Sequence, residues 1–425
     1  MTATRLLRNC SVFDPRSGTL SGGTSVLVSD DKIAAVSDQS IAAGGAEVID
    51  VGGRVVLPGL IDCHVHVNAV RVTSGLAANR VLPASFIAAA ASSVMRGMLL
   101  RGFTSIRDAG GADRGLRDAV EQDLFTGPRL FIAGRAISQT GGHGDFREQI
   151  DGPAPCGCAH FVSGIGRVAD GVPAVQQAVR DEIRLGANQI KIMASGGVAS
   201  AADPVHFLQY SRAELDAIVD EAQRADTYVM AHAYTPAAVS RTVEAGVRTI
   251  EHGNLIDEAT AALMAERGAY LVPTLITFKA LATYGGQLGF PPEMLAKLAS
   301  IVEVGTRSLR LAHAAGVKMA YGTDLLGELH QYQSEEFLIR AEALPTLEVL
   351  RSATTIAAEV LRMEGRLGVI APGAFADLVV VDGNPLEDLG RLQEQGRHLP
   401  CIIKGGRIVK NTLNGVAQPA AGEMA

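Results

Sequence analysis

Short apolar runs alternate with amphipathic stretches through the middle of the chain. The apolar runs are rich in β-branched residues and are bounded by turn residues, which is typical of buried strands. In the stretches between them, apolar residues recur every three to four positions, which indicates helices that pack one face on a core. We expect strands at residues 55–61, 103–107, 130–133, 189–193, 228–231, 248–250, 270–272 and 318–321. We expect helices at residues 86–101, 116–124, 175–185, 212–225, 236–245, 257–266, 293–314 and 347–363.

Eight strands that are each followed by a helix are the pattern of a (β/α)8 barrel, a fold of the α/β class. A doubly wound open sheet is the alternative, but it calls for a Gly-rich phosphate turn after its first strand. Pro58-Gly59, which interrupts the first run, is not such a turn. The pattern therefore predicts a TIM-like barrel.

Both ends of the chain carry shorter apolar runs separated by Gly, Asp and Ser, which predict strands. These runs lie at residues 5–9, 24–28, 32–36, 47–51, 376–382 and 401–409. We predict that residues 1–57 and 366–413 form one small composite β-sandwich domain and that residues 58–365 form the barrel. Residues 414–425, rich in Ala and Gly, are expected to be a disordered tail.

Composition and charge narrow the possible partners. The chain has 425 residues, of which 47% are hydrophobic, and this is ample for a large core. The net charge of −7 and the lack of a long basic run give no indication of nucleic-acid binding. No apolar stretch reaches the roughly 20 residues of a membrane span, and no signal pattern opens the chain. We expect a cytoplasmic homo-oligomer with no nucleic-acid or membrane partner.

The cysteines do not predict a disulfide framework, because they are scattered and odd in number. They are Cys10, Cys63, Cys156, Cys158 and Cys401. Cys156 and Cys158 have the spacing of half a metal site, but no second pair accompanies them, so reduced thiols are favoured.

The strongest chemical signal lies at the carboxyl ends of the predicted strands, where β/α barrels carry their active-site groups. His64 and His66 follow the first strand two positions apart, so their side chains point to the same face. Further polar residues at this end are His143 after strand three, Lys191 on strand four, His232 after strand five, His252 after strand six and Asp324 after strand eight. Asp108 follows strand two, but the Ala109-Gly110-Gly111 after it indicates a turn or capping residue.

Each of these residues also has a simpler explanation when it is taken alone. Lys191 lies between two isoleucines and could point outward between helices. Asp324 could cap the next helix. Their common position at one end of the predicted barrel favours a single site over independent coincidences.

A set of motifs resembles the amidohydrolase superfamily, and within it the imidazolonepropionase-like members that act as Xaa-Pro, Xaa-Arg or Xaa-Lys dipeptidases. The motifs are PGLIDCHVH at 58–66, FTSIRDAGG at 103–111, GGHGD at 141–145, QIKIMASGGV at 189–198, AHAY at 231–234, TIEHG at 249–253, GTD at 322–324 and FADLVVVDGNPL at 375–386. Together they span nearly the whole chain. Residues 322–337 most resemble the ochratoxin-hydrolysing amidohydrolases.

The resemblance implies two divalent metal ions, in most such proteins zinc. The implied ligands are His64 and His66 for one metal, His232 and His252 for the other, Lys191 as the bridge and Asp324 beside them. The lysine would be carboxylated by CO2, because two cations would repel an unmodified ammonium.

The resemblance also implies hydrolysis of an amide or peptide bond to a C-terminal amino acid, with a metal-bridging hydroxide as nucleophile. The substrate would be a dipeptide, an N-acyl amino acid or an ochratoxin-type amide. Asp324 would take the water's proton and pass it to the departing amine. His143 and Tyr234 are candidates to hold the developing oxyanion or the substrate carboxylate, although Tyr234 could equally be a packed aromatic residue.

Further substrate contacts are expected from the loops. Ser195 and Gly196 could present backbone N–H groups to an anion, and His330 lies in the loop after the last strand. In that loop Gln331 and Gln333 replace the Gly and Asn of relatives, so the relatives' specificity does not transfer directly. Apolar residues near the same end predict a hydrophobic or aromatic leaving amino acid; they are Phe207, Tyr210, Leu326 and Tyr332.

Two other functions stay open. A cyclic-amide hydrolase of the same superfamily would also keep the strand-four lysine, whereas the mononuclear deaminases generally lack it. A metal-free scaffold protein without catalytic activity would be expected to have lost ligands, and the chain has them all.

Overall fold

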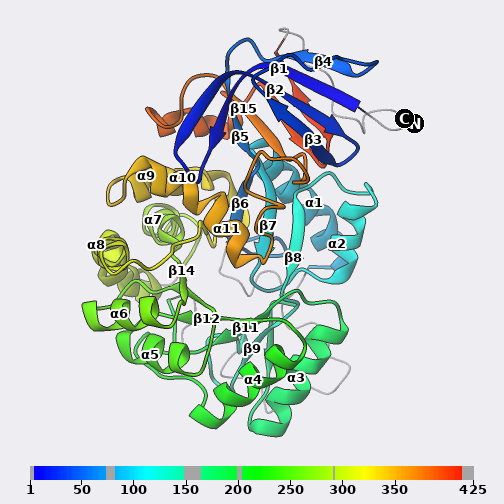
Figure 1. The fold of residues 1–425 in the computed structure, drawn as a ribbon. Helices are drawn as coiled ribbons and strands as arrows, with labels where there is room; N and C mark the ends of the chain where they lie inside the picture. Colours follow the sequence, from blue (N-terminus) through cyan, green and yellow to red (C-terminus); the bar gives the residue numbers. More distant parts are fainter. Residues whose placement is uncertain (1–3, 73–81, 148–163, 199–202, 291, 414–425) are drawn as a thin grey trace. The chain divides into compact units, whose positions relative to one another are not determined.

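The computed structural model describes residues 4–72, 82–147, 164–198, 203–290 and 292–413 (Figure 1). Cys156, Cys158 and the predicted tail lie outside these residues. The chain divides into two compact units. The first comprises Met1–Asp62, Arg96–Ser105 and Leu344–Ala425, and the second comprises Cys63–Met95 and Ile106–Ala343.

The first unit contains an eight-stranded sheet to which both ends of the chain contribute, blue and orange-to-red in Figure 1. Its strands are β1 (Thr4–Asp14), β2 (Thr19–Ser29), β3 (Lys32–Ser37), β4 (Glu47–Asp50), β5 (Val55–Pro58), β15 (Leu378–Val381), β16 (Cys401–Lys404) and β17 (Arg407–Asn411). They follow the order β17-β16-β15-β5-β1-β2-β3, and β4 pairs with β1. Val56 lies opposite Val380, and both belong to one buried apolar cluster with residues such as Leu7 and Ile403. Apolar burial thus holds the two ends of the chain together.

The first predicted strand, at residues 55–61, is wrong as a single strand. It is divided at Gly59 into β5 and β6 (Leu60–Val65), which belong to different sheets. The N–H of Gly59 donates to the carbonyl of Asp377 at 2.8 Å. A Cβ atom at this position would lie 2.0 Å from Oγ1 of Thr104, so the close approach requires glycine. The predicted run at 401–409 is likewise two strands, β16 and β17, joined by a two-glycine turn.

Two further sheets carry residues of the site. A six-stranded sheet has the order β10-β9-β11-β12-β13-β14, and a three-stranded sheet has the order β6-β7-β8. Their remaining strands are β7 (Phe103–Asp108), β8 (Arg129–Ile132), β9 (Ala136–Ser138), β10 (Gly166–Val168), β11 (Ile190–Met193), β12 (Val229–Ala233), β13 (Thr249–His252) and β14 (Tyr270–Val272). All pairings within the six-stranded sheet are parallel. Strands that alternate with helices confirm the predicted α/β class.

The helices follow most of the predicted amphipathic stretches. They are α1 (Ala84–Leu100), α2 (Arg114–Glu121), α3 (Val172–Arg184), α4 (Arg212–Arg224), α5 (Pro236–Glu244), α6 (Glu258–Glu266), α7 (Leu275–Tyr284), α8 (Pro292–Ala314), α9 (Glu335–Ala341), α10 (Thr346–Ser352) and α11 (Thr355–Val360). Helices α7 and α9 were not predicted from the sequence, and the single helix predicted at residues 347–363 is two helices, α10 and α11. Their break falls at Thr354, whose φ of −131° and ψ of −96° are not helical. In the described part of the chain, no helix combines the length and apolarity needed to cross a membrane.

The predicted strand at residues 318–321 is wrong as a regular strand. It is reduced to one parallel bridge between Met319 and Leu271 of β14. The N–H of Ala320 donates to the carbonyl of Leu271 at 2.9 Å, and the carbonyl of Tyr321 accepts from the N–H of Cys63 on β6 at 2.8 Å. The extended segment stays short because the chain soon turns, with a φ of +52° at Asp324.

Candidate metal centre

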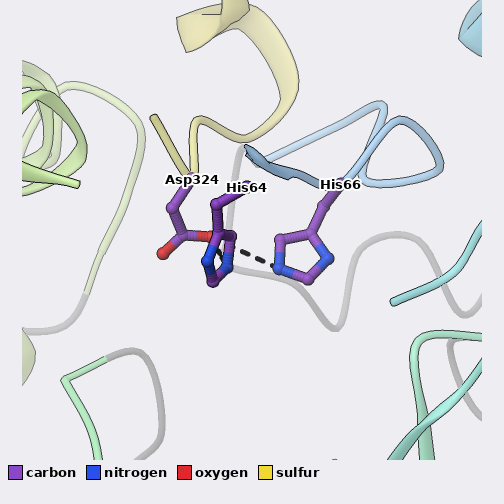
Figure 2. A group of neighbouring side chains, drawn as sticks. All are labelled: His64, His66 and Asp324. Carbon is purple, nitrogen blue, oxygen red and sulfur yellow. Dashed lines mark ion pairs between the residues drawn. The ribbon is translucent and has the colours of Figure 1, made fainter. Parts of the chain in front are cut away.

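All six predicted metal ligands line one cavity of the second unit: His64, His66, Lys191, His232, His252 and Asp324. The ring centroids of His64 and His66 lie 5.4 Å apart, and that of His252 lies 5.1 Å from His64 and 4.7 Å from His232. Figure 2 shows the carboxylate of Asp324 beside the first two rings. Its Oδ1 atom is 3.5 Å from Nε2 of His64 and 3.3 Å from Nε2 of His66. The structure therefore brings together all six residues for which the sequence predicted metal binding.

Strand register and two strained residues build this cluster. In the parallel pairing of β12 with β13, His252 lies opposite Ala233, so His232 and His252 reach the same end of neighbouring strands. His252 and Asp324 have φ values of 72° and 52°, which residues with a Cβ atom rarely adopt. The Asp324 N–H is held by the carbonyl of His64 at 2.8 Å. Backbone strain of this kind is characteristic of functional sites.

Hydrogen bonds select the ring nitrogen that each histidine presents to the cluster. Nδ1 of His64 lies 2.7 Å from Oε2 of Glu251, and Nδ1 of His66 lies 2.7 Å from the carbonyl of Gly110. Both oxygens accept, so Nδ1 carries the proton in each ring and Nε2 keeps its lone pair. Nε2 of His232 donates to the carbonyl of Gly196 at 3.2 Å, so in that ring it is Nδ1 that keeps its lone pair. Three imidazoles are thus oriented as metal ligands.

The buried rings favour their neutral forms. Burial, and then Lys191, lowers the pKa of His64 well below its usual value. Burial, followed by the neighbouring His143, lowers the pKa of His232. Burial lowers the pKa of His252 to about 3. Neutral imidazole is the form that binds metal ions.

The anionic partner of these rings is Asp324. Removal from water would raise its pKa, but His64 and His66 outweigh this effect and hold the pKa of Asp324 well below its usual range. Burial lowers the pKa of His66, whereas Asp324 raises it by more. Nε2 of His64, Nε2 of His66 and the carboxylate of Asp324 lie close together, and such a group attracts a cation, whether a proton or a metal ion.

Lys191 is 1% exposed and lies on β11 within the same cavity wall. Burial lowers the pKa of its amine to about 8, although Glu251 and Asp324 act in the opposite direction. The alternative in which Lys191 points outward between helices is therefore wrong, because Lys191 lines this cavity.

A buried ion pair behind His64 was missed by the sequence analysis. Arg107 of β7 and Glu251 of β13 are both 0% exposed and lie 2.9 Å apart. Arg107 also donates to the carbonyl of Cys63 at 2.6 Å, and Thr249 donates to Glu251 at 2.6 Å. The sequence did contain a signal for this pair, because an arginine and a glutamate each lie inside an apolar strand. Charged side chains that are buried in this way need partners of opposite charge.

The two predicted catalytic side chains beside the ligands also line the cavity. His143 stacks on His232, with ring centroids 4.2 Å apart and planes 18° apart. Tyr234 stacks on His252, with centroids 5.2 Å apart and planes 14° apart. Burial raises the pKa of Tyr234 well above its usual value, so its phenol stays protonated.

The structure does not bring the other predicted substrate contacts to the cavity wall. The hydroxyl of Ser195 donates to the carbonyl of Gly196, whose own N–H donates to the carbonyl of Phe207 at 2.9 Å. The N–H of Gly196 is therefore engaged within the protein rather than presented to an anion. His330 is buried in the 3-10 helix η2 (Gly327–Tyr332) and does not line the cavity either.

The predicted capping role of Asp108 is confirmed. Its carboxylate accepts the N–H groups of Val67, Gly110 and Ala112 at 2.9 to 3.1 Å. This hydrogen bonding holds the loop whose Gly110 carbonyl orients His66. Asp108 therefore supports the centre from outside it.

The remaining cavity wall is almost entirely apolar. The empty space measures about 630 Å³, part of it open to solvent. Apart from the residues described above, its lining consists of Phe146, Ile165, Met193, Val198, Thr277, Phe278, Leu281 and Leu326. Of the apolar residues predicted at this end, Leu326 lines the cavity. Phe207 is 51% exposed, Tyr210 hydrogen-bonds Ala169, and Tyr332 stacks on Tyr284.

An α/β fold with buried histidines and a carboxylate around one cavity is an arrangement that could hold divalent metal ions in a hydrolase. Residues 55–409 match the amidohydrolase family. The ochratoxinase of Aspergillus niger is 34% identical over 372 residues, which cover 84% of this chain and 76% of that protein. The chain therefore belongs to the amidohydrolase family and is a hydrolase of amide or peptide bonds, which confirms the resemblance drawn from its motifs.

Solved structures agree with this assignment. A prolidase crystallised with N-methylphosphonate-L-proline is 53% identical, with a TM-score of 0.94 and a match over 96% of this chain and 100% of that one. A Xaa-Pro dipeptidase with methionine bound in its active site is 30% identical, with a TM-score of 0.84 over 96% and 99% of the two chains. Members of the family generally use divalent metal ions.

Proposed function

We propose that the chain is a binuclear metal-dependent hydrolase that releases an apolar amino acid with a free carboxylate from a dipeptide or an N-acyl amino acid. The main support is the combination of six candidate ligands with an apolar cavity wall. The activities for which its relatives are named, those of a prolidase, a Xaa-Pro dipeptidase and an ochratoxinase, are consistent with such substrates.

The donor groups fit two divalent cations, zinc being our proposal. Burial favours the neutral imidazoles of His64, His232 and His252, and Asp324 is ionised. Four imidazoles, which bind metal in their neutral form, and one carboxylate carry too little negative charge for two such ions, and a carboxylated Lys191 would supply more. In its neutral form the lysine nitrogen can bond the carbon of CO2 and lose a proton, giving a carbamate. The pKa of about 8 makes that neutral form accessible near neutral pH.

When bound, divalent ions lower the pKa of a shared water from about 15.7 towards 7 and polarise a carbonyl oxygen. Asp324, as the ionised group among the rings, would accept the proton of the attacking water and deliver it to the departing amine nitrogen. The protonated phenol of Tyr234 can donate to a developing oxyanion. His143 stands beside it as a further substrate contact.

The cavity wall argues for an apolar leaving amino acid. Its described residues include no carboxylate besides Asp324, so a substrate arginine or lysine would find no counter-ion there. Phe278, Leu281 and Leu326 can cover a proline, methionine or phenylalanine side chain instead. An ochratoxin-type aryl amide of phenylalanine also fits this description.

The test is a metal count on the purified protein combined with paired substrates. We expect about two metal ions per chain, as in binuclear hydrolytic sites. N-acetyl-phenylalanine should be cleaved faster than its C-terminal amide and faster than N-acetyl-arginine. Equal rates of cleavage for the free acid and its amide would contradict recognition of the substrate carboxylate. A preference for the arginine substrate would contradict an apolar pocket for the leaving amino acid. A protein that opens only a cyclic amide such as hydantoin, or that binds no metal, would refute the proposal itself.

We further propose that the parallel strands close into one (β/α)8 barrel. The hydrogen bonds from residues 318–321 to both β14 and β6 support closure on one side. On the other side, the N–H of Asn188 donates to the carbonyl of Ile132 of β8 at 2.7 Å, just before β11. The division into a barrel of residues 58–365 and a β-sandwich of residues 1–57 and 366–413 stays a prediction.

A further inference from the structure

Asp203 is a buried carboxylate next to the substrate side of the cavity, and the function proposed above does not use it. It is 1% exposed. Its Oδ2 atom lies 3.1 Å from Nδ1 of His143 and accepts the N–H of Gly197 at 3.0 Å. The side-chain amide of Gln209 lies 3.4 Å from the same oxygen. A buried carboxylate is costly to desolvate, so its concentration of hydrogen bonds beside one histidine calls for a reason.

Neighbouring groups hold both the backbone and the imidazole ring of His143 in place. The side-chain oxygen of Gln209 accepts the N–H of His143 at 3.1 Å. The ring lies so close to Gly197 that a Cβ atom there would be 2.1 Å from its Cε1. Its other side stacks on His232. With the His143 ring held between these groups, the remaining variable is whether Nδ1 or Nε2 faces Asp203.

We infer that Asp203 is a positioning residue that sets the orientation and tautomer of His143. An ionised carboxylate only accepts hydrogen bonds, so the proton of the His143 ring lies on Nδ1. Nε2, on the opposite edge of the ring, then keeps its lone pair, so this tautomer accepts a hydrogen bond from a substrate N–H group instead of donating to an oxyanion or a carboxylate. This inference rests on the proposed hydrolase function, because it assigns His143 a substrate contact.

The size of the effect follows from geometry. A displacement of about 1 Å in a group that orients the substrate can cost about 10²-fold in rate. Replacing Asp203 by alanine frees the ring to rotate, so we expect kcat/KM to fall by about 10²-fold. The Asp203→Asn variant keeps an acceptor oxygen for Nδ1–H and should recover most of the activity.

The test is a double-mutant cycle on the metal-loaded protein with N-acetyl-phenylalanine as substrate. If Asp203 acts through His143, Asp203→Ala causes little further loss of kcat/KM in a His143→Ala background. The control is Asp377→Ala, because Asp377 is also buried, at 4% exposed, and accepts a loop N–H, that of Gly405, at 2.6 Å. Its effect should be the same in both backgrounds.

A second readout does not depend on activity. The ¹⁵N shifts of the His143 ring should show a proton on Nδ1 in the wild type and a mixture of tautomers in Asp203→Ala. Additive losses in the cycle, an unchanged tautomer, or a loss of metal from Asp203→Ala would each overturn the inference. If the wild type hydrolyses no amide at all, the proposed function fails, while the tautomer measurement still decides the role of Asp203.

Discussion

The buried pair of Arg107 and Glu251 offers the sharpest separation of metal binding from simple stability. Glu251 accepts from both Arg107 and Nδ1 of His64, at 2.9 and 2.7 Å. Glu251→Gln removes the negative charge while it nearly preserves shape. The chain also contains a matched pair, Arg340 and Glu336, which is 0% exposed with the same 2.9 Å separation and is not among the residues that line the cavity of the candidate ligands.

Both substitutions leave an arginine buried without its counter-charge. Breaking a buried pair in this way costs about 3–5 kcal/mol, so we expect Glu251→Gln and Glu336→Gln to lower the free energy of unfolding by similar amounts. Only Glu251→Gln also weakens the hydrogen bond that orients His64. Loss of such a partner typically reduces metal affinity by about 10–100-fold, or about 1.4–2.7 kcal/mol.

The assay has two parts. Urea unfolding of the metal-free variants measures the shared stability cost, and competition with a chromophoric chelator at fixed pH measures metal affinity. The reasoning is refuted if Glu336→Gln loses metal as strongly as Glu251→Gln. It is also refuted if Glu251→Gln binds metal like the wild type, because His64 would then not need its carboxylate partner.

Three further predictions concern the ligands themselves. Lys191→Ala should lose metal and activity and regain part of both with short carboxylic acids; a full metal complement in that variant would contradict carboxylation. Asp324→Asn should lower kcat by about 10²-fold or more, and near-normal kcat across the pH range would rule out its role in proton transfer. Metal-free protein should lose stability as pH falls from 7.5 to 5.5, because the pKa of His252 is about 3 when folded and near 6.5 when unfolded, so the unfolded chain binds the extra proton. In urea unfolding this contribution is about 1 kcal/mol at pH 5.5 and should be missing from His252→Asn; an identical pH slope in that variant would show that His252 is not the cause.

Local patterns in the sequence were sufficient for the α/β class and for the ligand cluster. Apolar runs and amphipathic stretches reflect the burial of residues that are close in the sequence, and the predicted ligands lie on or directly after the extended segments that the sequence predicts. The convergence of Lys191, His232 and His252 then follows from the parallel register of β11, β12 and β13. The same logic placed His143 and Tyr234 beside them.

Contacts between distant segments could be decided only by the tertiary structure. The strand break at Gly59 depends on Thr104, and the pair of Arg107 with Glu251 joins two strands whose own sequences do not name a partner. The N–H of Gly196 was expected to meet an anion, but it donates to Phe207, eleven residues later in the chain. Hydrogen-bond partners and packing neighbours of this kind are properties of the folded arrangement, because a sequence shows which groups need partners and the fold determines which partners they find.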